Sequence, residues 1–336
     1  MEEETMKKTV KGVALVTCMM VAPFVAGAQD FPDRTVENIF PWAPGGAMAA
    51  SQIIAEAMSE ELGVSMPVVS TPGAAGTKAV QVALAKPADG YTVIDGYVAP
   101  IVLMPVLGRA DWTYEDFTPL RGAVSNAFSI MGRADETRWE DFEGMMEWGK
   151  ENPGELRYSS GSRNNLPHMV IAKVLQSYGV VAQNIPYPSD PDAHKDLYAG
   201  VLDFAFHGPA DYLQWKDQGE VLLVLSELPD AKETYDGALT IAELDIDLGL
   251  SGLAPMGWTW WLVHPDTPED RVQVLADAMG RALERPDVQE RIANMGFNIL
   301  NYEPERYTEV VGPVVDQLQA MENALVWEEE ELRKLN

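Results

Sequence analysis

Two short loops rich in proline and glycine constrain this chain more than any other feature. The first, FPWAPGG at residues 40–46, follows a short apolar run and precedes a segment in which Ile54 and Met58 recur at helical spacing. The second, STPGAAGT at residues 70–77, follows another apolar run and precedes KAVQVALAK. One such cluster is typical of an ordinary structural turn. Two in succession predict two strand-to-helix units whose turns are bare of side chains.

The bareness of these turns favours a binding role for the backbone. If both strands are parallel in one sheet, both loops lie at its carboxyl edge, where open α/β sheets bind ligands. Backbone amides at the start of a helix have no intrahelical acceptor, so they attract anions. Neither loop contains an acidic residue. The sequence therefore predicts an anion-binding edge.

The N-terminal segment has the pattern of a cleaved export signal. Lys7, Lys8 and Lys11 precede an apolar run at residues 13–25, and an A-x-A cleavage site follows at residues 26–28. The run is too short to span a bilayer as a stable helix. We expect residues 1–28 to be removed and the protein to reside in the periplasm.

Cleavage would leave the mature chain without cysteine. Cys18 is the only cysteine, and Thr17 before it argues against a lipid anchor. The mature chain would start at Gln29, while the glutamates before Met6 leave open whether translation begins at Met1 or Met6. With 46% apolar residues, the chain fits one large domain or two smaller ones, and we expect two.

Charge and motif content exclude several function classes. The net charge is −28, so nucleic acid is not an expected partner. The four histidines have no zinc-site spacing, G-x-S-x-G is absent, and Gly76-Thr77-Lys78 has the wrong order for a phosphate loop. We expect no metal site, no cofactor and no catalytic set.

The order of segments resembles that of the periplasmic substrate-binding proteins of tripartite tricarboxylate transporters, also called Bug receptors. The likeness covers nearly the whole mature chain. It rests on FPDRTVENIFPWAPGG, TPGAAGTKAVQVALAKPADGYTVIDG, WTYEDFTPLRGAVSNAFSI, GKENPGELRYSSGSRNNLPHM, IPYPSDPDAHKDLYAGVLDFAFHG and MGWTWWLVHPDTPEDRV, which follow the family's order.

The resemblance implies a type II periplasmic binding protein fold, in which two α/β lobes are joined by two crossing strands with a ligand cleft between them. Domain I would comprise residues 30–130 and 258–336, and domain II residues 131–257. The β-prone runs FSIMG and WTWWLVH suit the crossings, and Pro313 is expected to break the final helical region. The C-terminal helix is expected to pack on domain I.

Family ligands are typically small carboxylates, held by backbone amides of the two domain I loops and read at the far end by domain II. Carried over by position, the resemblance nominates Trp42, Ala43, Pro44, Gly45 and Gly46 in the first loop and Ser70, Thr71, Gly73, Ala74, Ala75, Gly76 and Thr77 in the second. In domain II it nominates Ser159, Ser160, Gly161, Ser162, Arg163, Asn164, Asn165, His168 and His207.

Several roles stay open at this point. His168 has either a structural role in its helix or a ligand contact. Arg163, the one basic side chain among the nominated residues, either reads the distal end of the ligand or pairs with surface acids. Trp42 and the tryptophans at 258, 260 and 261 either line an aromatic pocket or pack in the core.

This sequence also departs from the family pattern around the cleft. The first loop lacks the aspartate and arginine that usually follow it, since AMAASQ offers neither. Ser70 stands where asparagine is usual, Ala75 and Ala79 replace glycines, and His207 replaces a common acidic residue. The ligand is therefore not assumed to be one of the family's citrate-like or dicarboxylate compounds.

The expected function is that of a monomeric solute receptor which captures a small organic carboxylate and delivers it to the permease subunits of a tripartite tricarboxylate transporter. An alternative is an extracytoplasmic sensing subunit of the same fold that acts on a signalling protein. A secreted hydrolase is a third class, which the lack of a nucleophile set disfavours.

Overall fold

The structure is a computed structural model of the 336-residue chain, and it describes residues 31–125, 127–226, 232, 234–244 and 258–335. The expected export signal and Cys18 lie outside the described residues, as do residues 245–257. No helix in the described ranges combines the length and the apolar character that a membrane span requires.

The first of two sheets contains the strands that precede both bare loops. Its order is β11-β4-β10-β3-β1-β2, with β1 parallel to β2 and β3, and with β10 and β11 antiparallel to their neighbours. The strands are β1 (Glu37–Phe40), β2 (Val68–Ser70), β3 (Thr92–Tyr97), β4 (Thr118–Ser125), β10 (Thr259–Val263) and β11 (Asn298–Tyr302). Because β1 and β2 are parallel neighbours, both loops leave the same edge, as the sequence predicts.

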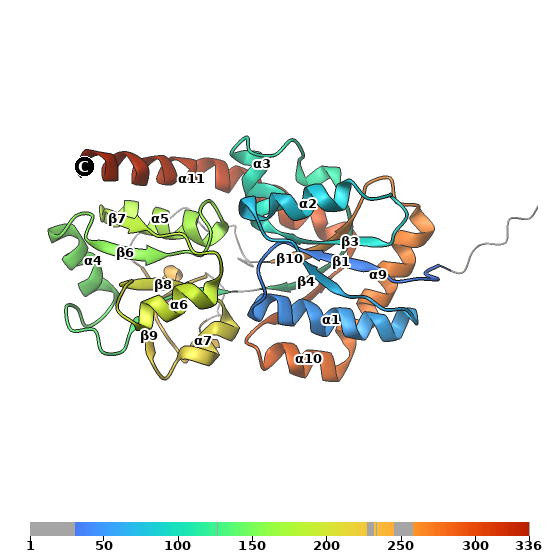
Figure 1. Ribbon diagram of the computed structural model, residues 1–336, viewed down its shortest axis with the longest axis horizontal. Coiled ribbons are helices and arrows are strands. Elements are labelled where there is room, and N and C mark those ends of the chain that lie inside the picture. Colours follow the sequence, from blue (N-terminus) through green and yellow to red (C-terminus); the bar gives the residue numbers. More distant parts are fainter. Residues whose placement is uncertain (1–30, 126, 227–231, 233, 245–257, 336) are drawn as a thin grey trace, which may run out of the picture. The chain divides into compact units, whose positions relative to one another are not determined.

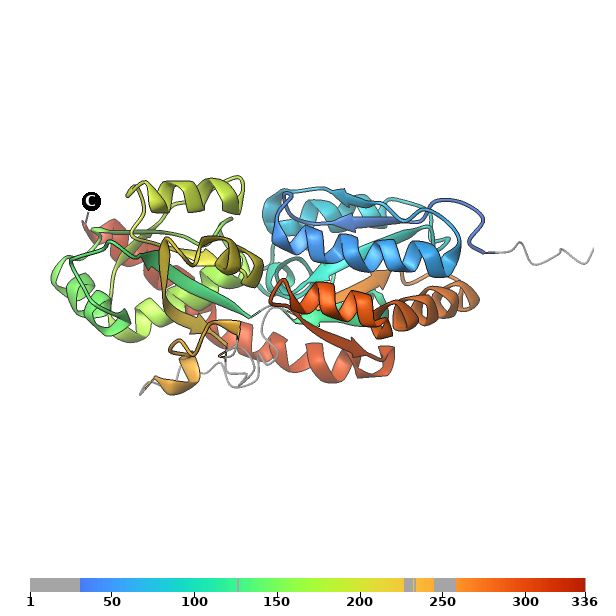
Figure 2. The same cartoon turned by 90° about the horizontal axis from the view of Figure 1, so that it is seen from below.

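Helices cover both faces of this sheet. Figure 1 shows α1 (Gly46–Leu62) and α10 (Pro286–Ala293) on one side and α2 (Thr77–Leu84) and α3 (Met104–Val106) on the other. The helix α9 (Glu269–Glu284) packs beside α1 and α10 (Figure 2). Ile54 and Met58 of α1 are buried, in agreement with their spacing. Short helical turns complete this part: η1 (Ala74–Gly76), η2 (Ala99–Leu103), η3 (Tyr114–Asp116) and η5 (Pro304–Arg306).

The second sheet has the order β7-β6-β8-β5-β9. Its strands are β5 (Phe128–Arg133), β6 (Leu156–Ser159), β7 (Ala182–Asn184), β8 (Phe204–His207) and β9 (Gly219–Leu225). The helices α4 (Phe142–Glu151), α5 (Leu166–Tyr178), α6 (Asp190–Tyr198) and α7 (Pro209–Trp215) belong to this part, with the turn η4 (Ile241–Glu243). The strand β6 is parallel to β7 and β8, so the loops after these three strands also share one edge.

The chain changes sheets twice. It leaves the first sheet after β4 and enters the second at β5, and it returns between β9 and β10. Of the two β-prone runs, FSIMG is therefore a strand of the second sheet, and TWWLV lies inside the first. The mixed α/β architecture with two sheets is the one expected.

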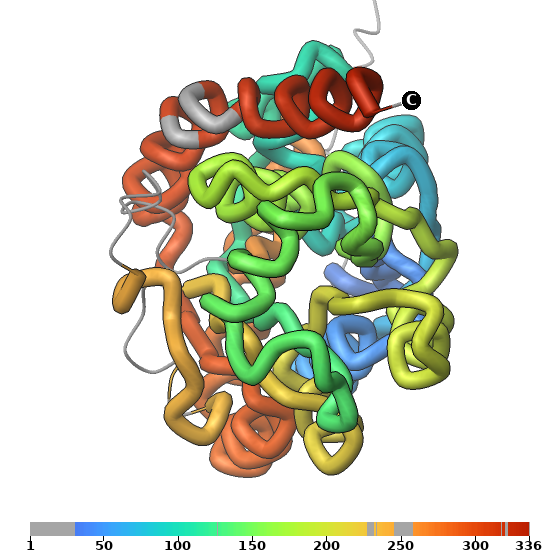
Figure 3. Tube along the Cα trace, turned by 90° about the vertical axis from the view of Figure 1, so that its left-hand side faces the viewer, coloured from blue at the N-terminus to red at the C-terminus, as the bar shows by residue number. Residues whose placement is uncertain are grey.

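The C-terminal helix α11 (Tyr307–Leu335) differs from expectation in two ways. It runs through Pro313 without a break, because its buried face, which includes Val311, Val314 and Leu318, packs well enough to offset the missing backbone hydrogen bond. It also packs on helix α5, which lies beside the second sheet (Figure 3), in addition to its contacts with η2 and with strand β4 of the first sheet.

Candidate ligand-binding cavity

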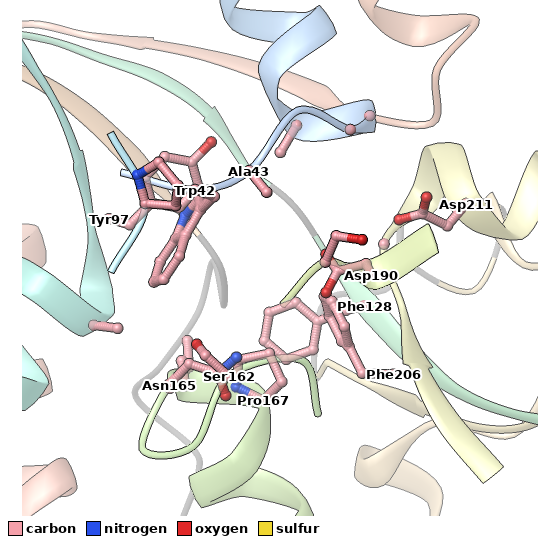
Figure 4. Close-up of a pocket in the computed structure, with 18 of the residues that line it drawn as sticks. Trp42, Ala43, Tyr97, Phe128, Ser162, Asn165, Pro167, Asp190, Phe206 and Asp211 are labelled. Carbon is pink, nitrogen blue, oxygen red and sulfur yellow. The ribbon is translucent and has the colours of Figure 1, made fainter. Parts of the chain in front are cut away.

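A cavity of about 440 Å³ lies at the edges of the two sheets from which the loops emerge. Its size is within the range of small-molecule sites. Segments of both sheets line it (Figure 4). The lining residues are 42–47, 72–75, 97–99, 128, 162, 165–167, 187–191, 206, 208, 210, 211, 258 and 297.

All five nominated residues of the first loop, Trp42 to Gly46, line the cavity. Gly45 precedes α1 in an extended conformation and supplies no side-chain cap. The first helical hydrogen bond runs from the amide of Ala49 to the carbonyl of Gly45 at 3.1 Å. The amides of residues 46–48 consequently have no intrahelical acceptor, which leaves a helix N-terminus open to an anion at the cavity wall.

The second loop places four successive residues at positive φ. Gly73 has a φ of 140°, Ala74 of 48°, Ala75 of 50° and Gly76 of 88°. A left-handed conformation costs an alanine roughly 1–2 kcal/mol, and strain of this kind concentrates at functional sites. In such a conformation, successive backbone N–H groups point to the same side and form a concave anion-binding site. Gly73, Ala74 and Ala75 line the cavity, together with Pro72, which was not nominated.

The other nominated residues of the second loop lie outside the cavity lining and hold its shape. The Ser70 hydroxyl donates to the carbonyl of Trp42 at 2.7 Å, which ties the two loops together. The Thr77 hydroxyl donates to the carbonyl of Ala74 at 2.9 Å. The amide of Thr71 donates to the carbonyl of Phe40 at 2.8 Å. A carbon atom added to Gly76 would lie 3.0 Å from Pro100, so the backbone packs closely there.

Of the loop between β6 and α5, Ser162 and Asn165 line the cavity. Asn165 caps α5 by accepting from the amide of His168 at 2.8 Å and donates to the carbonyl of Ser160 at 2.7 Å. The amide of Gly161 donates to the hydroxyl of Ser159 at 3.2 Å. Ser159, Ser160 and Gly161 thus shape the loop from outside the lining.

Arg163 and Asn164 are also outside the lining. The guanidinium of Arg163 is exposed and donates to the carbonyl of Asn184 at 3.1 Å. Asn164 has a φ of 61°, so the chain turns sharply between Arg163 and Asn165. The interpretation of Arg163 as a loop arginine, rather than the reader of the distal end, therefore fits this geometry better, although its pairing partner is a carbonyl instead of an acid.

His168 is buried in a network behind the loop. Its Nδ1 accepts from the amide of Asn164 at 2.9 Å, so the proton is on Nε2, which donates to Glu328 of α11 at 2.9 Å. The Tyr158 hydroxyl donates to the same carboxylate. Of the two roles left open for His168, this arrangement supports the structural one.

His207 does not line the cavity, although its chain neighbours Phe206 and Gly208 do. It is fully buried and stacks on His194 with ring centroids 3.8 Å apart. Its Nε2 lies 3.3 Å from the hydroxyl of Tyr198. Burial lowers the pKa of both histidines, so the pair is neutral at physiological pH.

Aromatic side chains form much of the wall. Trp42 and Tyr97 meet edge to face at 5.7 Å, and Phe128 and Phe206 do so at 5.3 Å. Trp258 lines the cavity and is also almost fully buried, whereas the tryptophans at 260 and 261 are fully buried in the first sheet and do not line the cavity. Of the four tryptophans, Trp42 and Trp258 thus line the cavity, and Trp258 belongs to the core as well.

Two acidic residues of the lining, Asp190 and Asp211, were not predicted from the sequence. They lie on the same side of the cavity, opposite Trp42 and Tyr97 (Figure 4). Burial raises the pKa of each to about 6, and for Asp190 the negative charge of Asp211 adds to the effect. Their position in the chain could have indicated them, because each aspartate follows a strand of the second sheet and lies in the first turn of a helix that begins with proline nearby.

No lysine, arginine or histidine belongs to the described lining. Within the described ranges there is also no group of three or more histidine, cysteine, aspartate or glutamate side chains that could hold a metal ion. The cavity therefore combines bare amides, aromatic walls and two carboxyl groups.

Comparison with known proteins assigns this chain to a family. Residues 50–325 match the model of the tripartite tricarboxylate transporter family receptor, TctC. The "UPF0065 protein in tcbD-tcbE intergenic region" of Pseudomonas sp. (strain P51) is 26% identical over 277 residues, which cover 82% of this chain and 81% of that protein.

Solved structures share the fold at lower identity. A Rhodopseudomonas palustris protein with adipate superimposes with a TM-score of 0.75 at 18% identity, over 88% of this chain and 98% of that one. MatC from R. palustris with bound malate gives 0.71 at 21% identity, over 90% and 100%. With the family match over most of its length, the chain belongs to the tripartite tricarboxylate transporter receptor family, whose members bind solutes and are not enzymes.

Proposed function

We propose that this protein is a periplasmic receptor that binds a small organic carboxylate in the cavity and delivers it to the permease subunits of a tripartite tricarboxylate-type transporter. The observation that carries the proposal is the pairing of two bare loops, at residues 42–47 and 72–75, on one wall of a cavity of suitable size. A helix N-terminus and a run of left-handed residues both offer amides to an anion.

The related structures support the ligand class. Malate and adipate, which occupy two proteins of this fold, are both small carboxylates. The nominated residues that line the cavity here are Trp42, Ala43, Pro44, Gly45, Gly46, Gly73, Ala74, Ala75, Ser162 and Asn165, and we propose these as the ligand-contacting set. Export through a cleaved signal and a monomeric state belong to the same proposal.

Native mass spectrometry of the mature chain, purified from the periplasm, tests the proposal. We expect one protein mass at the monomer and a second that is heavier by one small molecule. Fragmentation should release that molecule as a carboxylic acid. A bound molecule without a carboxyl group would contradict the ligand class, and a dimer would contradict the monomeric state. Loss of transporter-dependent uptake of that acid on gene deletion would favour transport over sensing.

A further inference from the structure

Neither of the two aspartates in the cavity forms an ion pair with a lysine or arginine among the described residues. The side chain of Asp190 makes no hydrogen bond with a described residue, and the backbone of Gly208 lowers the pKa of Asp211 in part. His194, one turn along α6 from Asp190, is kept neutral by burial and bonds to the carbonyl of Phe206 at 3.0 Å. Two partly buried carboxylates without an ion-pair partner are costly for a protein to keep.

Two glycines allow the backbone to lie close to the helices that carry Asp190 and Asp211. A carbon atom added to Gly161 would lie 2.7 Å from Oδ1 of Asp190, so glycine at this position accommodates the carboxylate. Gly46, at the start of α1, similarly packs against Ala210, where an added carbon would lie 2.5 Å from its Cβ. Asp211 is therefore next to the helix N-terminus of the first loop, and donors for an anion and acceptors for a cation face the same cavity.

We propose that the ligand is an amino-carboxylate, with its carboxylate on the bare loops and its protonated amine on Asp190 and Asp211. This inference rests on the proposed function and narrows its ligand class. An ammonium group would supply the missing counter-charge through charge-assisted hydrogen bonds, which are the stronger kind. A second carboxylate in its place would meet two like charges, which disfavours a dicarboxylate. The aromatic wall of Trp42 and Tyr97 suits the methylene groups between the two ends.

Isothermal titration calorimetry of the mature chain at pH 8 tests this assignment with four- and five-carbon probes. For each length, the probes are the monocarboxylate, the dicarboxylate, the α-amino acid and the ω-amino acid. We expect at least one amino acid to bind tenfold or more tightly than the monocarboxylate and dicarboxylate of its length. Asp190→Asn and Asp211→Asn should each reduce this preference to about threefold or less.

Asp192→Asn provides the matched control, because Asp192 is in the same first turn of α6 but is exposed, bonded to Ser189 at 2.6 Å and absent from the lining. It should leave the preference unchanged. Tighter binding of succinate or glutarate, or an undiminished preference in both cavity variants, would overturn this inference and leave the receptor proposal standing. Binding of none of the eight probes would also overturn this inference, whereas the receptor proposal is decided by the mass spectrometry of the co-purified ligand.

Discussion

Replacing Gly73 with proline should weaken ligand binding about 100-fold or more while the protein stays folded. Gly73 has a φ of 140°, which proline cannot adopt because its ring holds φ near −65°. The substitution removes one amide donor and forces the left-handed run at Ala74 and Ala75 to rearrange. Hydrogen bonds to a charged group contribute about 1.5–3 kcal/mol each, and about 1.4 kcal/mol corresponds to a tenfold change in affinity.

The fold should survive because Gly73 and Pro72 are exposed and outside the core. Calorimetric titration with the tightest-binding probe measures the affinity, and thermal unfolding checks the fold. Ala75→Gly is the control in the same loop: it relieves a left-handed alanine, so it should keep binding and leave stability equal or slightly higher. A folded Gly73→Pro variant with wild-type affinity would show that this loop does not hold the ligand.

Replacing Glu328 with alanine should lower the free energy of unfolding by about 3 kcal/mol. The buried carboxylate accepts from Tyr158 on β6 and His168 on α5, so its removal leaves two buried donors unpaired, at a cost of about 1–3 kcal/mol each. It also frees the end of α11 from the second sheet. Chemical denaturation followed by circular dichroism measures the difference.

Two variants of the same helix sharpen this test. Glu328→Gln retains one acceptor oxygen and should cost less than the alanine variant, and Glu329→Ala, at an exposed position, should change stability by less than about 0.5 kcal/mol. Equal stability of Glu328→Ala and Glu329→Ala would contradict the structural role of the network. Because His168 accepts from the amide of Asn164, the alanine variant should also loosen the loop that carries Ser162 and Asn165.

The sequence predicted the domain I side of the cavity best, because proline and glycine at a strand end leave few structural alternatives. Both bare loops lie where the parallel strands β1 and β2 put them. The position of the long helix α11 was predicted only in part, since the glutamate that bonds to α5 is one of many acidic residues near the C-terminus. A contact between residues 160 positions apart in the chain, such as His168 and Glu328, leaves no pattern in the local sequence.

The domain II side was harder to predict for two physical reasons. Arg163 was predicted to contact the ligand because it was the one basic side chain among the nominated residues. The left-handed conformation of Asn164 and the hydrogen bond from Arg163 to the carbonyl of Asn184 keep it outside the lining. Asp190 and Asp211 did not stand out, because the chain contains 52 acidic residues and most acids of such a chain are solvated. Only their burial against the cavity distinguishes these two.

A crystal structure of the mature protein with its co-purified ligand would show directly whether the two bare loops hold the carboxylate. We expect the carboxylate of the ligand within about 3.2 Å of backbone amides in both loops, residues 45–47 and 73–75, with no basic side chain in contact. A carboxylate held instead by Arg163, or a ligand bound outside this cavity, would contradict it.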